Sequence, residues 1–346
     1  MNKAARIPAR IFKILILAGT AAGILILGVL VGSSRIGPLD VFSIMAHKLF
    51  GMELPVHISD ADAVIVWTLR LPRVLLAFLV GGALSVSGCV VQSVLKNPLA
   101  TPYTLGVSSG ASLGAGLVIV FGLSLPFAGR FTLPLVGFLC GMGTVVLVLA
   151  FSSKVDRSMS NMTVILAGMV FSLFFNAILT VVTALAKGDK LKHVTLWQMG
   201  SFSMRGWEYL QMLLPFLLIG LAVMLCLNRE MDIMTFGEET ASSLGVNTVR
   251  VKRILFFCAA LLTGSAVAMC GTIGFVDLIA PHVARRYCGS KHRVLLPVCF
   301  VGGGCLMVLS DLIARTLISP SELPVGAITA IIGAPFFAYI YFKRMK

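Results

Sequence analysis

Residue patterns that would support catalysis, metal binding or nucleotide binding are missing from this chain. The sequence contains no HExxH and no GxxxxGK[ST], and its five histidines are dispersed along the chain. A metal or hydrolytic centre needs convergent side chains, and the common ATP site needs a P-loop. We therefore expect a chain that is not an enzyme, has no catalytic residues, and binds no metal or cofactor of its own.

Two carboxylates, Asp277 and Asp311, fall within long apolar runs. A carboxylate at the centre of a membrane helix costs about 2.5–3.5 kcal/mol, so each needs a partner or water. Pro281 lies four residues after Asp277 and has no N–H, so in a helix the carbonyl of Asp277 loses its usual partner. Two interpretations are open: Asp277 is protonated or hydrogen-bonded between helices, or it faces an aqueous path and tunes passage of a polar or cationic cargo.

The run Gly106-Val-Ser-Ser-Gly-Ala-Ser-Leu-Gly114 is small and polar on several faces. Glycines four residues apart let helix backbones approach closely in lipid. The run suits either a tight helix interface or the wall of an aqueous path. Ser108 and Ser109 are therefore candidates, with Asp277, for lining a translocation path.

A charged segment at about 229–253 interrupts the apolar pattern. Within it, Glu238 and Glu239 fall in the first turn of a short predicted helix, where carboxylates favour the positive end of the helix dipole. Thr235 or Gly237 can cap this helix, and Gly245 can end it. A short surface helix is either a handle for a partner or a solvated connector.

The elements that carry these residues are membrane helices. The chain has 346 residues, 58% hydrophobic and 12% charged, with a mean hydropathy of +0.98; a soluble domain has about 25% charged residues. Apolar runs of spanning length predict an all-α polytopic membrane protein of about ten helices in a single domain, 1–346. The predicted spans are 12–32, 66–94, 102–122, 131–152, 162–186, 208–228, 253–271, 274–288, 294–314 and 325–342.

The net charge of +14 comes from Lys and Arg residues that lie between these spans rather than in one dense stripe. Nucleic acid is therefore not an expected partner. Most of the 28 Lys and Arg residues fall on one side if both termini are cytoplasmic, which agrees with the positive-inside rule. The loop 187–205 is then outside.

The two halves, about 12–186 and 208–342, echo each other weakly. Arg73-Val-Leu opens a run that reaches Gly82 and Gly88, and Arg253-Ile-Leu opens one that reaches Gly264 and Gly271. The two runs belong to the second and seventh helices, which would cross in opposite directions. Such inverted repeats are typical of transporters, although chance could produce so short a match.

Ordered motifs in the chain resemble the FecCD-type permeases, the membrane subunits of type II ABC importers for siderophores, haem and cobalamin. The first half carries Leu69-Arg-Leu-Pro-Arg-Val-Leu, Asn97-Pro-Leu-Ala and Leu105-Gly-Val-Ser-Ser-Gly-Ala. The second half carries Gly237-Glu-Glu-Thr-Ala-Ser-Ser-Leu-Gly-Val, Ile273-Gly-Phe-Val-Asp-Leu-Ile-Ala-Pro-His, His292-Arg-Val-Leu-Leu-Pro, Ser310-Asp-Leu-Ile-Ala-Arg, Glu322-Leu-Pro-Val-Gly and Gly333-Ala-Pro-Phe-Phe. The resemblance covers about 66–342.

The resemblance implies a permease subunit in a bacterial inner membrane. It implies a second permease copy or paralogue, two cytoplasmic ATPase subunits that hold the ATP and Mg, and an extracytoplasmic binding protein. The motif that begins at Gly237 implies coupling to the ATPase by Gly237, Glu238, Glu239, Leu244 and Gly245.

Three arginines match positions that present charge to the binding protein in the resembling permeases: Arg70, Arg73 and Arg315. A simpler interpretation is that their side chains reach the membrane interface. Asp277 departs from the family pattern, which usually has a small residue there.

The expected function is the translocation path of an ABC importer, with an iron-siderophore-type chelate as the expected cargo. Haem and cobalamin remain open. The alternative is an ion-coupled secondary transporter with inverted repeats, which would require a cluster of intramembrane carboxylates. A channel is a more distant alternative, because no filter-like repeat is present.

Overall fold

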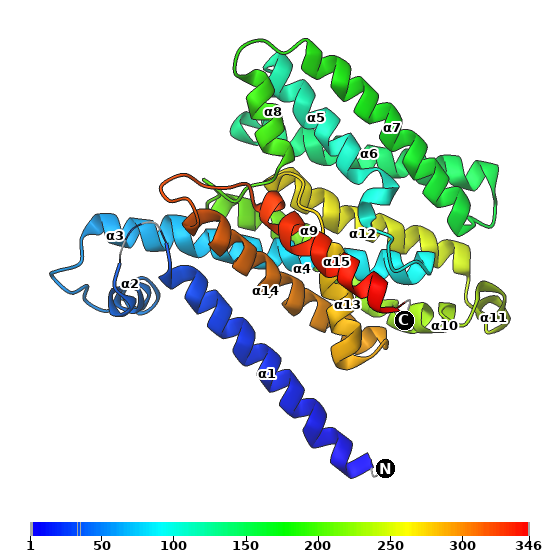
Figure 1. Cartoon of the computed structure of the whole chain (residues 1–346), viewed down its shortest axis with the longest axis horizontal. Coiled ribbons are helices and arrows are strands. Elements are labelled where there is room, and N and C mark those ends of the chain that lie inside the picture. Colours follow the sequence, from blue (N-terminus) through cyan, green and yellow to red (C-terminus); the bar gives the residue numbers. More distant parts are fainter. Residues whose placement is uncertain (1–2, 33, 35, 345–346) are drawn as a thin grey trace.

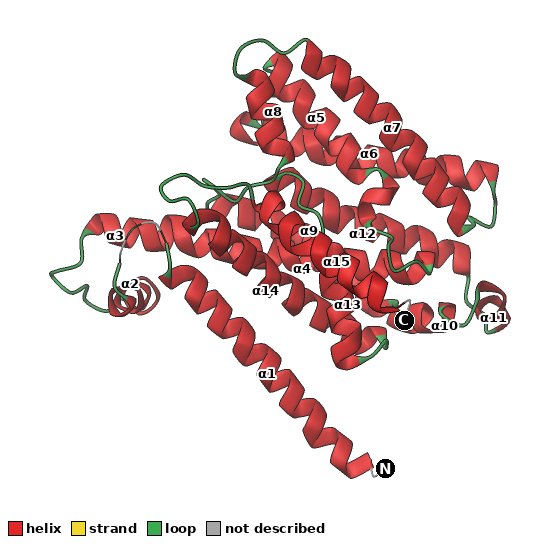
Figure 2. Cartoon of the chain, in the orientation of Figure 1, coloured by secondary structure: helices red, strands yellow, loops and turns green. Residues whose placement is uncertain are grey.

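The computed structural model describes residues 3–32, 34 and 36–344, and these residues form helices and loops without a strand (Figure 2). The all-α prediction is confirmed. The helices are α1 Lys3–Leu30, α2 Pro38–Phe50, α3 Asp60–Val64, α4 Leu71–Leu95, α5 Val107–Phe121, α6 Thr132–Val155, α7 Asn161–Ala184, α8 Lys190–Gln198, α9 Trp207–Cys226, α10 Asn228–Met234, α11 Glu238–Ser243, α12 Thr248–Cys270, α13 Val276–Cys288, α14 His292–Thr316 and α15 Val325–Arg344. A π-helical segment, Ile65–Arg70, joins α3 to α4 without a break.

Every predicted span coincides with a helix, but not every helix is long enough to cross a membrane. Among the described residues, six helical stretches have the length and composition of a span, the longest being Asp60–Leu95. Helix α13, with 13 residues, is the shortest helix among the predicted spans. At about 1.5 Å per residue it falls short of a hydrocarbon core of about 30 Å. The eighth predicted span, 274–288, is therefore a half-length helix, α13, that does not cross the hydrocarbon core by itself.

The third predicted span is also divided. A 3₁₀ turn, Pro102–Leu105, precedes α5, and Gly106 between them has φ +81°. An L-residue rarely adopts this left-handed conformation, so glycine is needed where the chain changes from one helix type to the other.

Two short helices, α2 and α8, were not predicted. Helix α2 has Pro38 in its first turn and Gly51 in the left-handed conformation just after its end, a combination that starts and stops helices. Both helices are too short for a span, so a search for spanning segments does not find them.

The helices form two groups (Figure 1). Helices α5 to α8 lie together, and α4, α9, α12, α13, α14 and α15 form the other group, with α1 diverging from it toward its N-terminus. Along the long axis, α2 and α3 lie at one end, here called the α2 end. Helices α10 and α11 lie at the opposite end, the α11 end, toward which both termini point.

Helix α4 is the centre of the larger group and is buried over most of its length. Its glycines permit close crossings: a Cβ at Gly81 would collide with the carbonyl oxygen of Gly303 on α14, and one at Gly88 with the carbonyl oxygen of Asp277 on α13. The hydroxyl of Ser87 donates to the carbonyl of Ala259 on α12 at 2.8 Å. Helices α4 and α12 pack against each other and run antiparallel, as the weak inverted repeat requires.

Candidate functional site

The predicted surface helix of the charged segment is α11, at the α11 end of the molecule. Gly237 is its N-cap with φ +126°, Glu238 and Glu239 lie in its first turn, and Gly245 follows it with φ +84°. Both glycines have backbone conformations that other residues rarely adopt. Leu244 is 65% exposed and Phe236 is 78% exposed, so α11 lies between two apolar side chains that face outward.

A buried lysine, which the sequence analysis missed, fixes α11 to the membrane helices. Lys252, near the start of α12, is 0% exposed. Its Nζ lies 2.6 Å from Oε1 of Glu238 and donates to the carbonyl of Met159, in the loop between α6 and α7, at 3.0 Å. A buried ammonium needs such partners because desolvation is costly. Glu238 therefore both favours the start of α11 and ties it to α12 and to the α6–α7 loop.

The three arginines predicted to dock a binding protein lie at the α2 end, with their charges already engaged inside the chain. Arg70 is 4% exposed, and its guanidinium donates to the carbonyl of Leu30 at 3.1 Å and to Oγ of Ser34 at 2.7 Å. Arg315 is also buried and donates to the carbonyl of Gly28. Arg70 and Arg315 are thus buried and the side chain of Arg73 is 11% exposed, and the docking role of the three arginines stays a prediction.

Arg73 on α4 is the centre of an ion cluster with α14 and the loop that follows it. Its Nε and Nη2 lie 3.1 and 2.8 Å from Oδ1 of Asp311, and its Nη1 lies 2.7 Å from Oε1 of Glu322. Arg315 lies 3.7 Å from the other oxygen of Asp311. Burial raises the pKa of Glu322, but the hydrogen bond and charge of Arg73 outweigh this effect, and the pKa is lowered overall. Asp311 therefore has the partners that a buried carboxylate requires.

Asp277 lies in the first turn of α13 and is 1% exposed. Gln92 on α4 donates to its carbonyl at 3.1 Å and so replaces the partner that Pro281 removes. Its two carboxylate oxygens accept no hydrogen bond that meets normal geometry in the described part of the chain, although the N–H groups that open α13 lie near them. In this conformation Asp277 is buried between helices, as the first interpretation predicts, and does not open to an aqueous path.

The small-residue run packs α5 tightly against α6. A Cβ at Gly110 would collide with Oγ1 of Thr144, and one at Gly114 would lie 2.9 Å from Cβ of Cys140. Ser109 is buried and donates to the carbonyl of Gly106 at 2.9 Å, whereas Ser108 is half-buried. The geometry favours the tight-interface interpretation of this run.

Metal binding has no candidate site in the described residues, since no group of three or more His, Cys, Asp or Glu side chains converges there. The functional geometry is therefore that of a helical bundle with an exposed, anchored surface helix at one end and a buried ion cluster at the other.

The chain matches known proteins over almost its whole length. The FecCD transport family matches residues 18–343. The chain is 45% identical over 326 residues to the uncharacterized ABC transporter permease protein YvrB of Bacillus subtilis, covering 93% of this chain and 91% of that protein. It is 37% identical to the hemin transport system permease protein HmuU of Yersinia pestis, covering 81% and 84%.

A solved structure of an inward-facing ABC transporter, assigned to the metal-chelate type, has the same fold. The TM-score is 0.79 at 32% identity, covering 95% of this chain and 99% of that chain. With the motifs, the fold and these relatives together, the chain belongs to the FecCD transport family and is the multi-pass, membrane-spanning permease subunit of an ABC importer.

Proposed function

We propose that this permease conducts an iron-siderophore-type chelate into the cell, driven by separate ATPase subunits that bind at α10 and α11. The observation that carries the proposal is the anchoring of an exposed helix by a fully buried lysine. Lys252 joins Glu238 on α11 to α12 and to the α6–α7 loop. A partner that moves α11 therefore acts directly on the membrane helix α12 and on the α6–α7 loop.

The arrangement suits energy coupling because α11 is both accessible and fixed. Leu244 offers an exposed apolar contact beyond the helix, and Glu239 leaves an exposed carboxylate on it. Coupling requires an element whose displacement by one partner biases a second arrangement of the helices. The predicted roles stay as proposals: Glu238 and Glu239 steer or cap, and Leu244 and Gly245 make the close contact with the ATPase.

The cargo proposal is supported by the relatives. The named cargo of the relative HmuU is hemin, and the similar solved structure is assigned to the metal-chelate type. A ferric siderophore belongs to the same broad class of bulky metal chelates. The second permease subunit is proposed to bind an apolar surface such as the outer face of α7, where Val170, Leu173 and Val181 are exposed. Such a face can contact either the lipid or a second permease copy.

The α2 end is proposed to receive the extracytoplasmic binding protein. A hollow of about 150 Å³ is lined there by Arg70, Arg73, Arg205, Arg315 and a single carboxylate, Glu322, among other residues. These four arginines outnumber the two carboxylates beside them, Asp311 and Glu322, so the hollow keeps a net positive field that favours acidic partner groups. Association with the binding protein should weaken as salt rises; an affinity independent of salt would contradict electrostatic docking.

This arrangement requires cytoplasmic termini and an outer α8. In a Cys-free background, Lys190→Cys should react with an impermeant thiol reagent added outside intact cells. Reaction only after the reagent gains access to the cytoplasm would contradict the orientation.

Cargo and energy source can be tested together in a host without its own chelate permeases. The permease is expressed with its ATPase and binding protein, and uptake is measured for ferric hydroxamate, ferric catecholate, hemin, cobalamin and molybdate. We expect uptake of a ferric siderophore that disappears when the P-loop lysine of the ATPase is replaced. Uptake that persists without ATPase activity, or that is confined to another compound, would contradict the proposal.

A further inference from the structure

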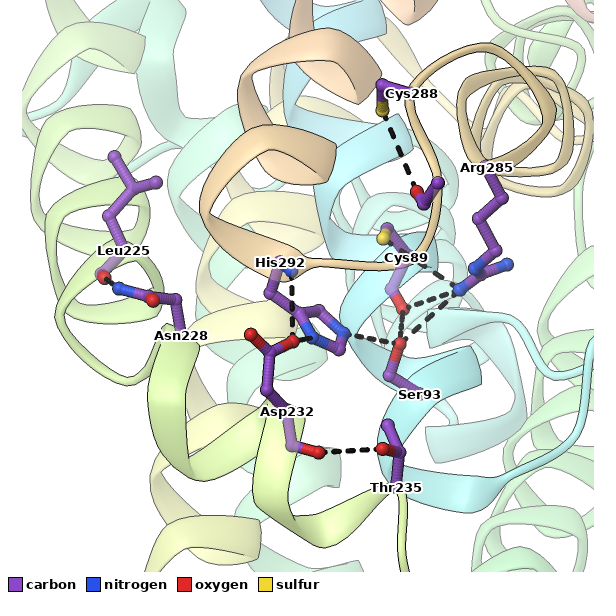
Figure 3. A network of polar contacts seen from close by, with 10 residues as sticks. Cys89, Ser93, Leu225, Asn228, Asp232, Thr235, Arg285, Cys288 and His292 are labelled. Atoms are coloured by element: carbon purple, nitrogen blue, oxygen red, sulfur yellow. Dashed lines mark hydrogen bonds and ion pairs between the residues drawn. The ribbon is translucent and has the colours of Figure 1, made fainter. Parts of the chain in front are cut away.

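A second anchor at the α11 end joins α10 to two other helices (Figure 3). Oδ1 of Asp232 on α10 accepts the backbone N–H of His292 at 3.0 Å and lies 2.6 Å from Nδ1 of the same residue, at the start of α14. Nε2 of His292 lies 2.8 Å from Oγ of Ser93 on α4. Because a carboxylate accepts hydrogen bonds, the proton is assigned to Nδ1. Asp232, His292 and Ser93 are called the α10 clamp below.

Asp232 supplies what the start of α14 lacks. The N-cap residue of α14, Lys291, has no side-chain capping bond, and the first turn of α14 contains no acidic residue. Four N–H groups at a helix start have no intrahelical partner, and a carboxylate there is favourable. The carboxylate of Asp232 takes this place from a different helix, so the position of α14 depends on α10.

The hydrogen bonds continue from the α10 clamp to α13. Nη2 of Arg285 on α13 lies 3.4 Å from Oγ of Ser93, and its Nη1 donates to Oε1 of Gln92 on α4 at 2.5 Å. Gln92 then donates to the carbonyl of Asp277 at 3.1 Å. One hydrogen-bonded series thus runs from α10 through α14 and α4 to the first turn of α13.

Asp232 gives the α10 side of this series an exposed carboxylate. His292 and Gln92 are buried, whereas the side chain of Asp232 is 37% exposed. It lines a cleft of about 980 Å³ whose wall also contains Thr235 and Phe236, the residues that lead to α11. The other members of the series that border this cleft are Gln92, Ser93, Arg285 and His292. A partner bound at α11 therefore lies close to Asp232, and Asp232 in turn contacts the buried His292 at the start of α14.

We propose that the α10 clamp transmits displacement of the α10–α11 segment to α14 and α4, and through Arg285 and Gln92 to α13. The inference rests on the proposed coupling role of α11. Asp232, His292 and Ser93 are positioning residues, because they act through the helices that they hold. Because Gln92 donates to the carbonyl of Asp277, this unusual residue forms the end of the series.

The first test measures the clamp in the permease alone and needs no cargo. Spin labels are placed at Thr240 on α11 and Val294 on α14, in a Cys-free background, and their distance distribution is measured. Asp232→Asn and His292→Asn should each broaden the distribution, and the double variant should broaden it no further. His193→Asn, on the exposed face of α8, is the matched control. An unchanged distribution in the clamp variants would overturn the proposal.

The second test measures coupling in the permease–ATPase complex in proteoliposomes. Cargo transported per ATP hydrolysed should fall about five- to tenfold in Asp232→Asn and His292→Asn, the size of a typical coupling energy. Asp232→Glu should restore part of the ratio, because it keeps the carboxylate. An unchanged ratio in an intact complex, or loss of complex assembly in both variants, would overturn a transmitting role. Failure of the wild type to transport a ferric chelate would contradict the proposed cargo but leave the label distances to decide the clamp.

Discussion

The two ends of the α4–α14 pair are joined by different chemistry. At the α2 end, Arg73 on α4 holds Asp311 on α14 through two nitrogens and also holds Glu322, and the charges are satisfied within the chain. At the α11 end, Ser93 on α4 meets His292 on α14 through one hydrogen bond, and His292 depends in turn on Asp232. The first end is a multidentate charge cluster, and the second is a single series of contacts.

This difference indicates which end is built to move. A bidentate guanidinium–carboxylate pair fixes both distance and orientation. The single hydrogen bond between Ser93 and His292 resists displacement less, and His292 connects it to α10, which leads to the exposed apolar side chains of Phe236 and Leu244. We interpret the α2 end as the fixed point of the pair and the α11 end as its handle.

Removing Asp311 should have the largest effect on stability. Asp311→Ala leaves Arg73 and Arg315 buried without their shared carboxylate, and loss of one partner of a buried pair costs about 3–5 kcal/mol. We expect a large fall in the thermal unfolding temperature of the purified permease. Asp189→Ala, at an exposed loop position, is the control and should change stability by less than about 0.5 kcal/mol. Equal effects of the two variants would show that the cluster does not fix the α2 end.

Gly245→Pro should have the next largest effect, and it should act on coupling rather than on the α2 end. Proline requires φ near about −65°, whereas Gly245 has φ +84°. The segment after α11 must therefore rearrange, and cargo transport should be lost while the purified permease still unfolds cooperatively. Gly245→Ala meets no neighbouring atom within 4 Å and should retain intermediate transport. Normal transport with proline at this position would remove α11 from the coupling mechanism.

Lys252→Met should weaken the anchor of α11 by a smaller amount. The variant removes the charge that Glu238 and the carbonyl of Met159 share, and leaving such groups without their partner costs about 1–3 kcal/mol. Transport per ATP hydrolysed should fall while the ATPase stays bound. Lys192→Met, on the exposed surface of α8, controls for the loss of one positive charge. If both lysine variants behave alike, the buried ammonium has no special role.

Asp277→Asn should have the smallest effect. The carbonyl bond to Gln92 is kept, because only the side chain changes, and the buried charge is removed. Folding and assembly should be preserved or slightly improved, with uptake near the wild-type level. A large change in uptake with normal assembly would instead show that Asp277 reaches the cargo in another conformation of the transport cycle.

Hydropathy and charge were sufficient to predict the helical class and the position of every main helix, because long apolar runs are a local property. The short predicted span 274–288 agrees with α13, whereas the positive φ of 70° that Phe275 takes just before the helix was not predictable from hydropathy. Gly237, Glu238 and Gly245 could be placed correctly from local capping rules, since caps depend on neighbouring residues.

Contacts between distant segments could not be predicted from one sequence. The absence of an N–H at Pro281 predicted a free carbonyl on Asp277, but its partner Gln92 lies 185 residues away. The partner of Arg73 on α14 could not be predicted for the same reason, because Asp311 is 238 residues away. Charge pairs that close a bundle depend on the packing of helices rather than on their local patterns.

The central claim is that the ATPase engages the α11 end, and it is tested most directly by copurification of the ATPase with permease variants. Leu244 after α11 is 65% exposed, and Leu123 in the loop after α5 is 50% exposed. Leu244→Glu should abolish copurification of the ATPase, whereas Leu123→Glu should leave it intact. Retention of the ATPase by the Leu244 variant, or its loss from the Leu123 variant, would contradict the account.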